Sequence, residues 1–143
     1  MTQEEKDLLV KDLCARLPYN VKAYVKHWAK LDRKYYEGVY TVESIHPSLN
    51  NILVYSERFA VEVLVGYYDY EIKPYLFPLS SITEEQNKEL DQAIELELKA
   101  IGGEIDHVQA TAFEVDFYNK HHFDWRGLIS IGLALDATDK NIY

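Results

Sequence analysis

Hydrophobic positions in the first 18 residues recur at the spacing of one helix face. The repeating leucines are Leu9, Leu13 and Leu17. Thr2 and Glu5 match a capping box at the start of this stretch, and Pro18 ends it. The pattern therefore predicts a helix over residues 1–18. Cys14 lies beside the apolar stripe, so we expect it to be a core residue.

The pattern changes in residues 19–82, where short runs are rich in Val, Ile and Tyr. The runs are GVYTVESI (38–45), NNILVYS (50–56) and FAVEVLVGYY (59–68). Runs of this kind predict β-strands. In the last of them, valines occupy every second position from 61 to 65, so one face of that strand is apolar.

The apolar residues of 20–36 fit both the two-residue repeat of a strand and the 3.6-residue repeat of a helix. As a strand, the stretch turns alternate residues from Val21 to Val25 inward, whereas as a helix it places both valines on one face with Trp28. We favour a strand over 21–28, followed by a charged loop, and the helical alternative stays open.

Residues 71–81 contain two prolines, which lack the N–H that a central strand needs. We therefore expect an extended connector or a short 3₁₀ turn in this stretch. Its packing residues would be Ile72, Leu76 and Phe77.

Two helices are expected in the last third of the chain. The first covers residues 83–101, where Thr83 and Gln86 match a capping box and a glycine pair follows. The second runs from about residue 106 to residue 121. Its expected inward residues are Val108, Ala112, Phe113, Val115 and Phe117.

Together these elements predict an α+β fold in a single domain over residues 1–143. We expect a small curled antiparallel sheet or barrel from about residues 20–70. It would be packed with the N-terminal helix and with two to three C-terminal helices from the helical part, 83–143.

The charge of the chain is concentrated in one stretch. The net charge is −9, and residues 84–116 carry ten acids against two lysines, which accounts for −8. A phosphate backbone binds cations, so this stretch disfavours nucleic acid and favours a basic protein partner or a role in solubility alone.

The hydrophobic pattern also bears on location. The longest apolar runs are far short of the ~20 residues that cross a bilayer, so we expect no membrane partner. The charged N-terminal stretch lacks the pattern of a secretory signal, and the single cysteine suits a reducing compartment. We therefore expect a cytoplasmic protein.

The run FYNKHHFDWRGLI (117–129) raises the question of a metal or catalytic cluster. Neighbouring histidines on a helix point about 100° apart, so His121 and His122 are poorly placed to share one ion. We favour a corner in which Asp124 caps a short following helix and Phe123 packs against Leu128 as a hydrophobic staple. We expect no cofactor, and a metal-assisted hydrolase that uses His121, His122, Asp124 or Asp116 is the weaker alternative.

Tyrosine provides the strongest binding signal, because ten of the twelve tyrosines fall between residues 19 and 75. The pairs Tyr35–Tyr36 and Tyr67–Tyr68 cannot both point inward on a strand, so some tyrosines must be exposed. Exposed tyrosine beside arginine is typical of protein interfaces, and it can also stack single-stranded bases. The candidate binding residues are Tyr35, Tyr36, Tyr67, Tyr68, Tyr70, Arg33, Lys34 and Arg58.

Three stretches of the chain resemble a family of small proteins from Bacteroidales phages, prophages and mobile elements. They are KDLCARLPYNVK (11–22), EIKPYLFPLSSITEEQ (71–86) and HHFDWRGLISIGLALDATDKNIY (121–143), about a third of the chain. The resemblance implies a bacterial cytosolic setting and a mobile-element origin, and it implies no catalytic residue. We expect the strings at the two ends of the chain to meet in space.

From these observations we expect a non-enzymatic protein-binding module rather than an enzyme. An acidic inhibitor or modulator of a host protein is one version of this function. Binding of single-stranded nucleic acid by the tyrosine-rich part remains an alternative.

Overall fold

A computed structural model of the chain describes residues 1–46, 51–65, 70–102 and 107–143. Its elements, in chain order, are α1 (Gln3–Arg16), the 3₁₀ turn η1 (Leu17–Tyr19), β1 (Lys22–Ala29), β2 (Lys34–Ile45), β3 (Ile52–Ser56), β4 (Val61–Val65), β5 (Tyr70–Leu76), the 3₁₀ turn η2 (Leu79–Ser81), α2 (Glu84–Ile101), α3 (His107–Lys120) and β6 (Leu135–Asp136). The predicted α+β class is confirmed. Both predicted capping boxes, Thr2 with Glu5 and Thr83 with Gln86, are formed.

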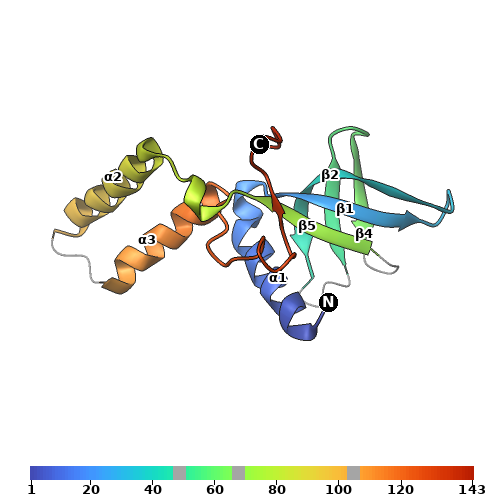
Figure 1. The fold of residues 1–143 in the computed structure, drawn as a ribbon, viewed down its shortest axis with the longest axis horizontal. Helices are drawn as coiled ribbons and strands as arrows, with labels where there is room; N and C mark the ends of the chain where they lie inside the picture. The colour runs from blue at the N-terminus through green and yellow to red at the C-terminus, as the bar shows by residue number, and fades with distance from the viewer. Residues whose placement is uncertain (47–50, 66–69, 103–106) are drawn as a thin grey trace.

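One curled sheet holds all six strands in the order β4-β3-β2-β1-β5-β6, and it does not close into a barrel (Figure 1). Neighbouring strands are antiparallel except β5 and β6, which are parallel. The strand prediction for 21–28 is confirmed, and Val21, Ala23 and Val25 are fully buried on the inner face.

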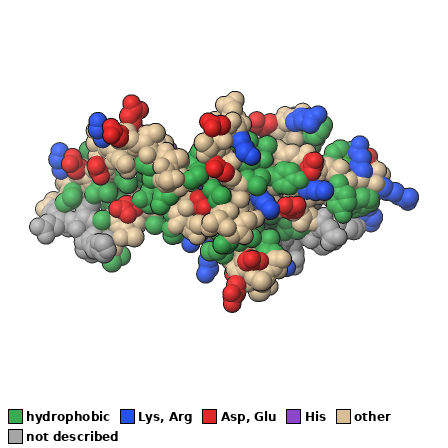
Figure 2. All heavy atoms as spheres, viewed as in Figure 1, with side chains coloured by type: hydrophobic (Ala, Val, Ile, Leu, Met, Phe, Trp, Pro, Cys, Tyr) green, Lys and Arg blue, Asp and Glu red, His purple; other side chains and the backbone are tan. Residues whose placement is uncertain are grey.

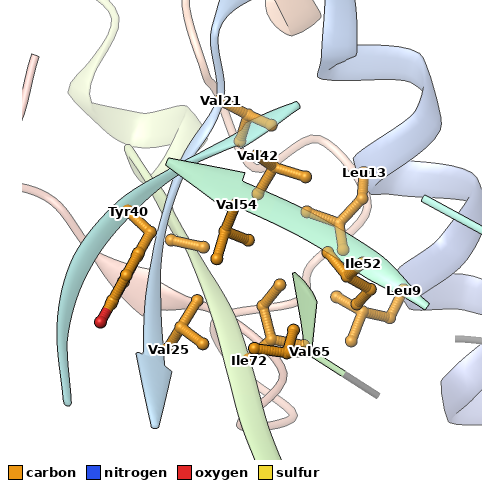
Figure 3. Close-up of a cluster of buried hydrophobic side chains, with 11 residues drawn as sticks. Leu9, Leu13, Val21, Val25, Tyr40, Val42, Ile52, Val54, Val65 and Ile72 are labelled. Atoms are coloured by element: carbon orange, nitrogen blue, oxygen red, sulfur yellow. The ribbon is translucent and has the colours of Figure 1, made fainter. Parts of the chain in front are cut away.

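The core lies between α1 and one end of the inner face of the sheet. Leu9 and Leu13 of α1 pack against inward side chains from five strands, and Figure 3 shows how these side chains converge. The strand residues in this cluster are Val21, Ala23, Val25, Tyr40, Val42, Ile52, Val54, Val65 and Ile72. Burying apolar side chains of this size stabilises the fold by roughly 1.5–3 kcal/mol each.

The prediction for Cys14 is wrong, because its side chain is exposed. The buried face of α1 consists of Leu9, Asp12, Leu13 and Arg16. A position next to the leucines along the chain lies about 100° away around the helix. The buried face therefore turns away from Cys14 and toward two charged residues.

The prediction for residues 71–81 is confirmed for the 3₁₀ turn at Leu79–Ser81 and wrong for the residues before it, because β5 is an inner strand of the sheet despite Pro74. The Leu76 carbonyl oxygen accepts a hydrogen bond from the Ala137 N–H on the β6 side. Peptide groups two residues apart face the same side of a strand, so the missing N–H of Pro74 also faces that side. Since β6 pairs only with Tyr75 and Leu76, the proline interrupts no ladder bond.

The C-terminal helices do not pack on the sheet as expected. Figure 1 shows α2 and α3 lying side by side and projecting away from the strands. In α3, Val108 and Ala112 are exposed, while Phe113, Val115 and Phe117 are half-buried. The prediction that all five face a core is therefore wrong, because α2 covers only part of the α3 surface.

A buried ion pair joins distant segments of the chain. The Arg16 side chain donates to both carboxylate oxygens of Asp12 at 2.9 and 3.0 Å, and both side chains are fully buried. Arg16 Nη2 also donates to the Phe123 carbonyl oxygen at 2.7 Å. The expectation that the strings at the two ends of the chain meet is confirmed.

The remaining stretch of the family resemblance, residues 71–86, also contacts the C-terminal segment near Phe123. The Phe77 N–H donates to the His122 carbonyl oxygen, and the Asp124 N–H donates to the Phe77 carbonyl oxygen, each at 2.8 Å. The C-terminal segment therefore continues from this bridge toward β6 along β5.

We expect Arg16→Met to lower the free energy of unfolding by about 3–5 kcal/mol, because it leaves the Asp12 carboxylate buried without its partner. Urea denaturation of the two proteins measures the difference. Lys11→Met, at an exposed position on the same helix, is the control and should change stability little. A loss under 1 kcal/mol for Arg16→Met would contradict the role of the pair.

Candidate functional site

The run at 117–129 forms a structural corner, but not with a second helix. Asp124 accepts hydrogen bonds from the Leu128 and Ile129 N–H groups at 2.7 and 2.9 Å. Residues 125–132 form turns, so the predicted short helix is wrong. Gly127 and Gly132 have φ values of 76° and 79°, which interrupt helical geometry.

The candidate metal residues of this corner point to other partners. His121 Nε2 lies 3.7 Å from Glu89 Oε2, and both Asp124 oxygens accept backbone hydrogen bonds. The His122 ring stacks on the Tyr143 ring with a centroid distance of 3.8 Å. Within the described ranges, no three His, Cys, Asp or Glu side chains are grouped so that they could hold a metal ion.

Tyr143 fixes the C-terminal segment to the sheet. Its hydroxyl donates to the Tyr75 carbonyl oxygen at 2.8 Å and accepts from the Lys22 N–H at 3.1 Å. The ladder between β1 and β5 ends at Ala23 and Pro74, so this hydroxyl bridges the next pair of residues. Burial beside His122 raises the pKa of Tyr143.

A pocket of about 530 Å³ lies at the opposite end of the inner face, beyond the reach of α1. It sits where the β1–β2 hairpin and the β3–β4 hairpin end. Its apolar lining comes from Trp28, Ala29, Leu31, Phe59, Val61, Val63, Leu64 and Val65. A volume of this size, with mostly apolar walls, is typical of a ligand or anchor pocket.

Strand register brings three polar rings into this pocket. His27 is paired with Tyr36 on β2 and with Tyr70 on β5, so the three side chains cross the inner face in a row. The His27 and Tyr36 rings are stacked at a centroid distance of 6.1 Å. The Tyr40 hydroxyl lies 3.2 Å from His27 Nε2, and in Figure 3 it points away from Leu9 and Leu13 of α1.

The buried rings of the pocket are uncharged at neutral pH, while Lys30 and Asp32 add one basic and one acidic side chain to its lining, and Asp32 accepts a hydrogen bond from the Tyr36 hydroxyl at 2.6 Å. Burial lowers the pKa of His27, which favours the neutral imidazole. Burial also raises the pKa of the Tyr40 and Tyr70 hydroxyls, which keeps both protonated. The interior therefore suits an apolar group and offers hydrogen bonds without a net charge.

Basic side chains surround the mouth of the pocket. Lys34 Nζ lies 4.7 Å from the centre of the Tyr36 ring, and the Arg58 guanidinium lies 5.2 Å from the centre of the Phe59 ring. Arg33 and Lys30 lie in the exposed β1–β2 turn. We call Lys30, Arg33, Lys34 and Arg58 the basic rim. Figure 2 shows Lys and Arg side chains at this end of the molecule.

The structure divides the predicted tyrosine site between two faces. Tyr36 and Tyr70 line the pocket, whereas Tyr35 is 49% exposed on the outer face of the sheet. The prediction that Tyr35 and Tyr36 cannot both point inward is confirmed. Tyr67 and Tyr68 lie outside the described residues. The predicted basic residues Arg33, Lys34 and Arg58 belong to the basic rim.

Of the 14 residues that line the pocket, sequence reasoning named only Tyr36 and Tyr70 as candidate site residues, and those it missed include His27, Tyr40 and Phe59. A signal for His27 was available, because the alternation that buries Val21 and Val25 also turns His27 inward. For Phe59 no such signal exists, since it lies in the turn between β3 and β4 and its direction depends on that turn.

Comparisons of the chain with protein-family models, with curated proteins and with solved structures gave no match. Among the described helices, none is both long enough and apolar enough to span a bilayer. The function must therefore be argued from the pocket and its rim.

The corner predicts a pH-dependent stability. Burial, Arg16 and His121 together lower the pKa of His122 from 6.5 to about 4 in the folded chain. Between these two values, the unfolded chain binds a proton that the folded chain does not. The free energy of unfolding should therefore fall by about 3 kcal/mol as the pH falls from 6.5 to 4, and this term is constant above 6.5.

Urea denaturation at several pH values checks this expectation against two variants. In His122→Gln, this part of the pH dependence should disappear, whereas His121→Gln, next to it in the chain, should retain it. Equal pH profiles for wild type and His122→Gln would contradict the assignment.

Proposed function

We propose that this protein is a non-enzymatic module that captures a partner protein at the open end of its sheet. The observation that carries the proposal is a mostly apolar pocket of about 530 Å³, whose lining includes Lys30 and Asp32 and which lies next to the other residues of the basic rim. An apolar side chain of the partner would fill the pocket. Acidic residues of the partner would lie beside Arg33, Lys34 and Arg58.

The residue types at the pocket support this use. Tightly bound interfaces have a few aromatic and arginine residues around a desolvated centre, surrounded by a polar edge. Here Tyr36, Tyr40 and Phe59 form the centre and the basic rim forms the edge. Phe59 and Leu31 are 51% and 99% exposed, so part of the apolar surface is open to solvent in the free protein.

The pocket chemistry favours binding over catalysis. His27 Nε2 is within hydrogen-bonding distance of the Tyr40 hydroxyl, and the pKa shifts of both groups hold them neutral. A tyrosine hydroxyl whose pKa is raised is a poor nucleophile, because nucleophilic catalysis needs an activated group.

The resemblance to small proteins of Bacteroidales phages, prophages and mobile elements suggests where the module acts. It favours a bacterial cytoplasm and a host protein as the partner. The acidic helix pair α2 and α3 supports a role as an inhibitor or modulator, because residues 84–116 carry a net charge of −8 that a basic host surface would attract.

A pull-down from Bacteroidales lysate tests this function with the double variant Tyr36→Ala/Phe59→Ala. We expect a partner protein that wild type recovers and the double variant loses, because the variant removes two pocket walls. Leu96→Ala/Val108→Ala removes exposed apolar side chains on α2 and α3 and should retain the partner. Equal recovery by all three proteins, or recovery by none, would contradict the proposal.

The outer face of the sheet favours nucleic acid as a second candidate. Trp28 and Tyr35 form an aromatic pair with a centroid distance of 5.0 Å, and Lys26 Nζ lies 5.3 Å from the centre of the Tyr35 ring. Exposed aromatic and basic side chains of this kind can stack unpaired bases.

Fluorescence anisotropy with a labelled oligothymidine tests this second function. Binding that weakens strongly with added salt, and that Trp28→Ala/Tyr35→Ala abolishes, would support it. Because Tyr36 and Phe59 do not belong to this aromatic pair, Tyr36→Ala/Phe59→Ala should leave oligothymidine binding unchanged. Absence of binding at low salt would rule it out.

A further inference from the structure

Strand β4 is the free edge of the sheet next to the pocket. It is the last strand in the sheet order on that side, so alternate peptide groups along it face away from β3. Val61 and Leu64 of this strand are 46% and 60% exposed. Natural edge strands are often protected by charged side chains or proline, and the β4 sequence VEVLV has no proline and one charged residue, Glu62.

The pocket runs along this edge. Val61, Val63 and Val65 all line it, and their alternation places them on the inner face of β4. A strand added beside β4 would continue that inner face. Every second side chain of the added strand would then face the pocket.

Charge separates the two faces of this edge. Glu62 lies on the outer face near Glu43, and desolvation, followed by repulsion from Glu62, raises the pKa of Glu43. The Arg58 guanidinium lies 5.2 Å from the centre of the Phe59 ring, and Phe59 lines the pocket. An acidic side chain of an added strand is therefore favoured on the pocket side, near the turn between β3 and β4.

We infer that β4 receives an extended segment of the partner as a further strand of the sheet, with an apolar side chain in the pocket and an acidic side chain beside Arg58. This inference rests on the proposed function and names the form of the partner. Main-chain hydrogen bonds supply affinity in this mode of recognition, and the pocket supplies specificity.

The same charges favour a foreign segment over a second copy of this chain. Two copies paired edge to edge would each present β4, whose only acid, Glu62, faces the outer side. Residues 61–65 of the second copy would bring no acid to Arg58. A peptide with both apolar and acidic side chains can pair with the β4 edge and place an acid beside the basic rim.

The probe for the test is a phage-displayed library of random peptides selected on the immobilised protein. Enriched peptides are synthesised, and their dissociation constants are measured by fluorescence anisotropy. We expect sequences with apolar residues at alternate positions and at least one acidic residue. A library that yields no binder to the wild type would overturn both the inference and the proposed function.

Backbone methylation of an enriched peptide separates strand addition from simple pocket filling. In a strand, alternate N–H groups point to the neighbouring strand. N-methylation of one alternating set should therefore weaken binding at least about tenfold, a loss of about 1.4 kcal/mol, while the other set is tolerated. Equal tolerance of both sets, together with sensitivity to Tyr36→Ala/Phe59→Ala, would overturn strand addition and leave the proposed function standing.

A matched pair of protein variants gives a second test, which is read together with the methylation result because Leu64 also lines the pocket. Leu64→Lys places a protecting charge on the edge strand, and Leu96→Lys makes the same change at a similarly exposed position on α2. Leu64→Lys should weaken peptide binding about tenfold even though it adds an attractive charge for an acidic peptide, and Leu96→Lys should not. Wild type that dimerises in sedimentation, with Leu64→Lys monomeric, would assign the edge to a second copy and overturn the inference.

Discussion

The buried pair of Asp12 and Arg16 determines how the ends of this chain come together. Two charges removed from water are tolerated only when they are paired and their remaining hydrogen-bonding atoms are satisfied. Asp12 alone cannot satisfy the guanidinium, so Arg16 also donates to the Phe123 carbonyl oxygen. Arg126 Nε, 3.4 Å from Asp12 Oδ1, makes a second ionic contact from the same C-terminal segment. The first helix therefore needs the last 20 or so residues to complete its buried face.

This requirement also explains why the pocket exists. With its charged positions against the C-terminal corner and its leucines against the sheet, α1 covers only the end of the inner face near Val21 and Ile52. The sheet is longer than the part that α1 covers, since β1 continues to Ala29 and β2 begins at Lys34. Core and pocket are thus two ends of one apolar surface, of which one is covered and the other is open.

Much of the fold could be predicted from the sequence, because alternation and capping are local signals. The inward residues of β1, both capping boxes and the end of α2 at Gly102 follow from a few neighbouring residues. The face of α1 could not be predicted in this way, since apolar patterning assigns Asp12 and Arg16 to solvent. Nor could β5, because the position of Pro74 is harmless only if β6 is two residues long. Of the candidate site, Tyr36, Tyr70 and three of the four basic-rim residues were identified from the sequence, but the pocket depends on how far α1 reaches, which is a property of the assembled fold.

Charge is distributed unevenly along the molecule. Acidic side chains cover α2 at one end, and Lys and Arg side chains project from the β1–β2 hairpin at the other (Figure 2). The protein therefore has a dipole moment along its long axis, in addition to its net charge of −9. In the field of an acidic surface, this dipole turns the hairpin end forward before any contact forms. The electric field therefore orients the molecule before it contacts the acidic surface. Salt screens this field, which at physiological ionic strength extends over a Debye length of about 8 Å.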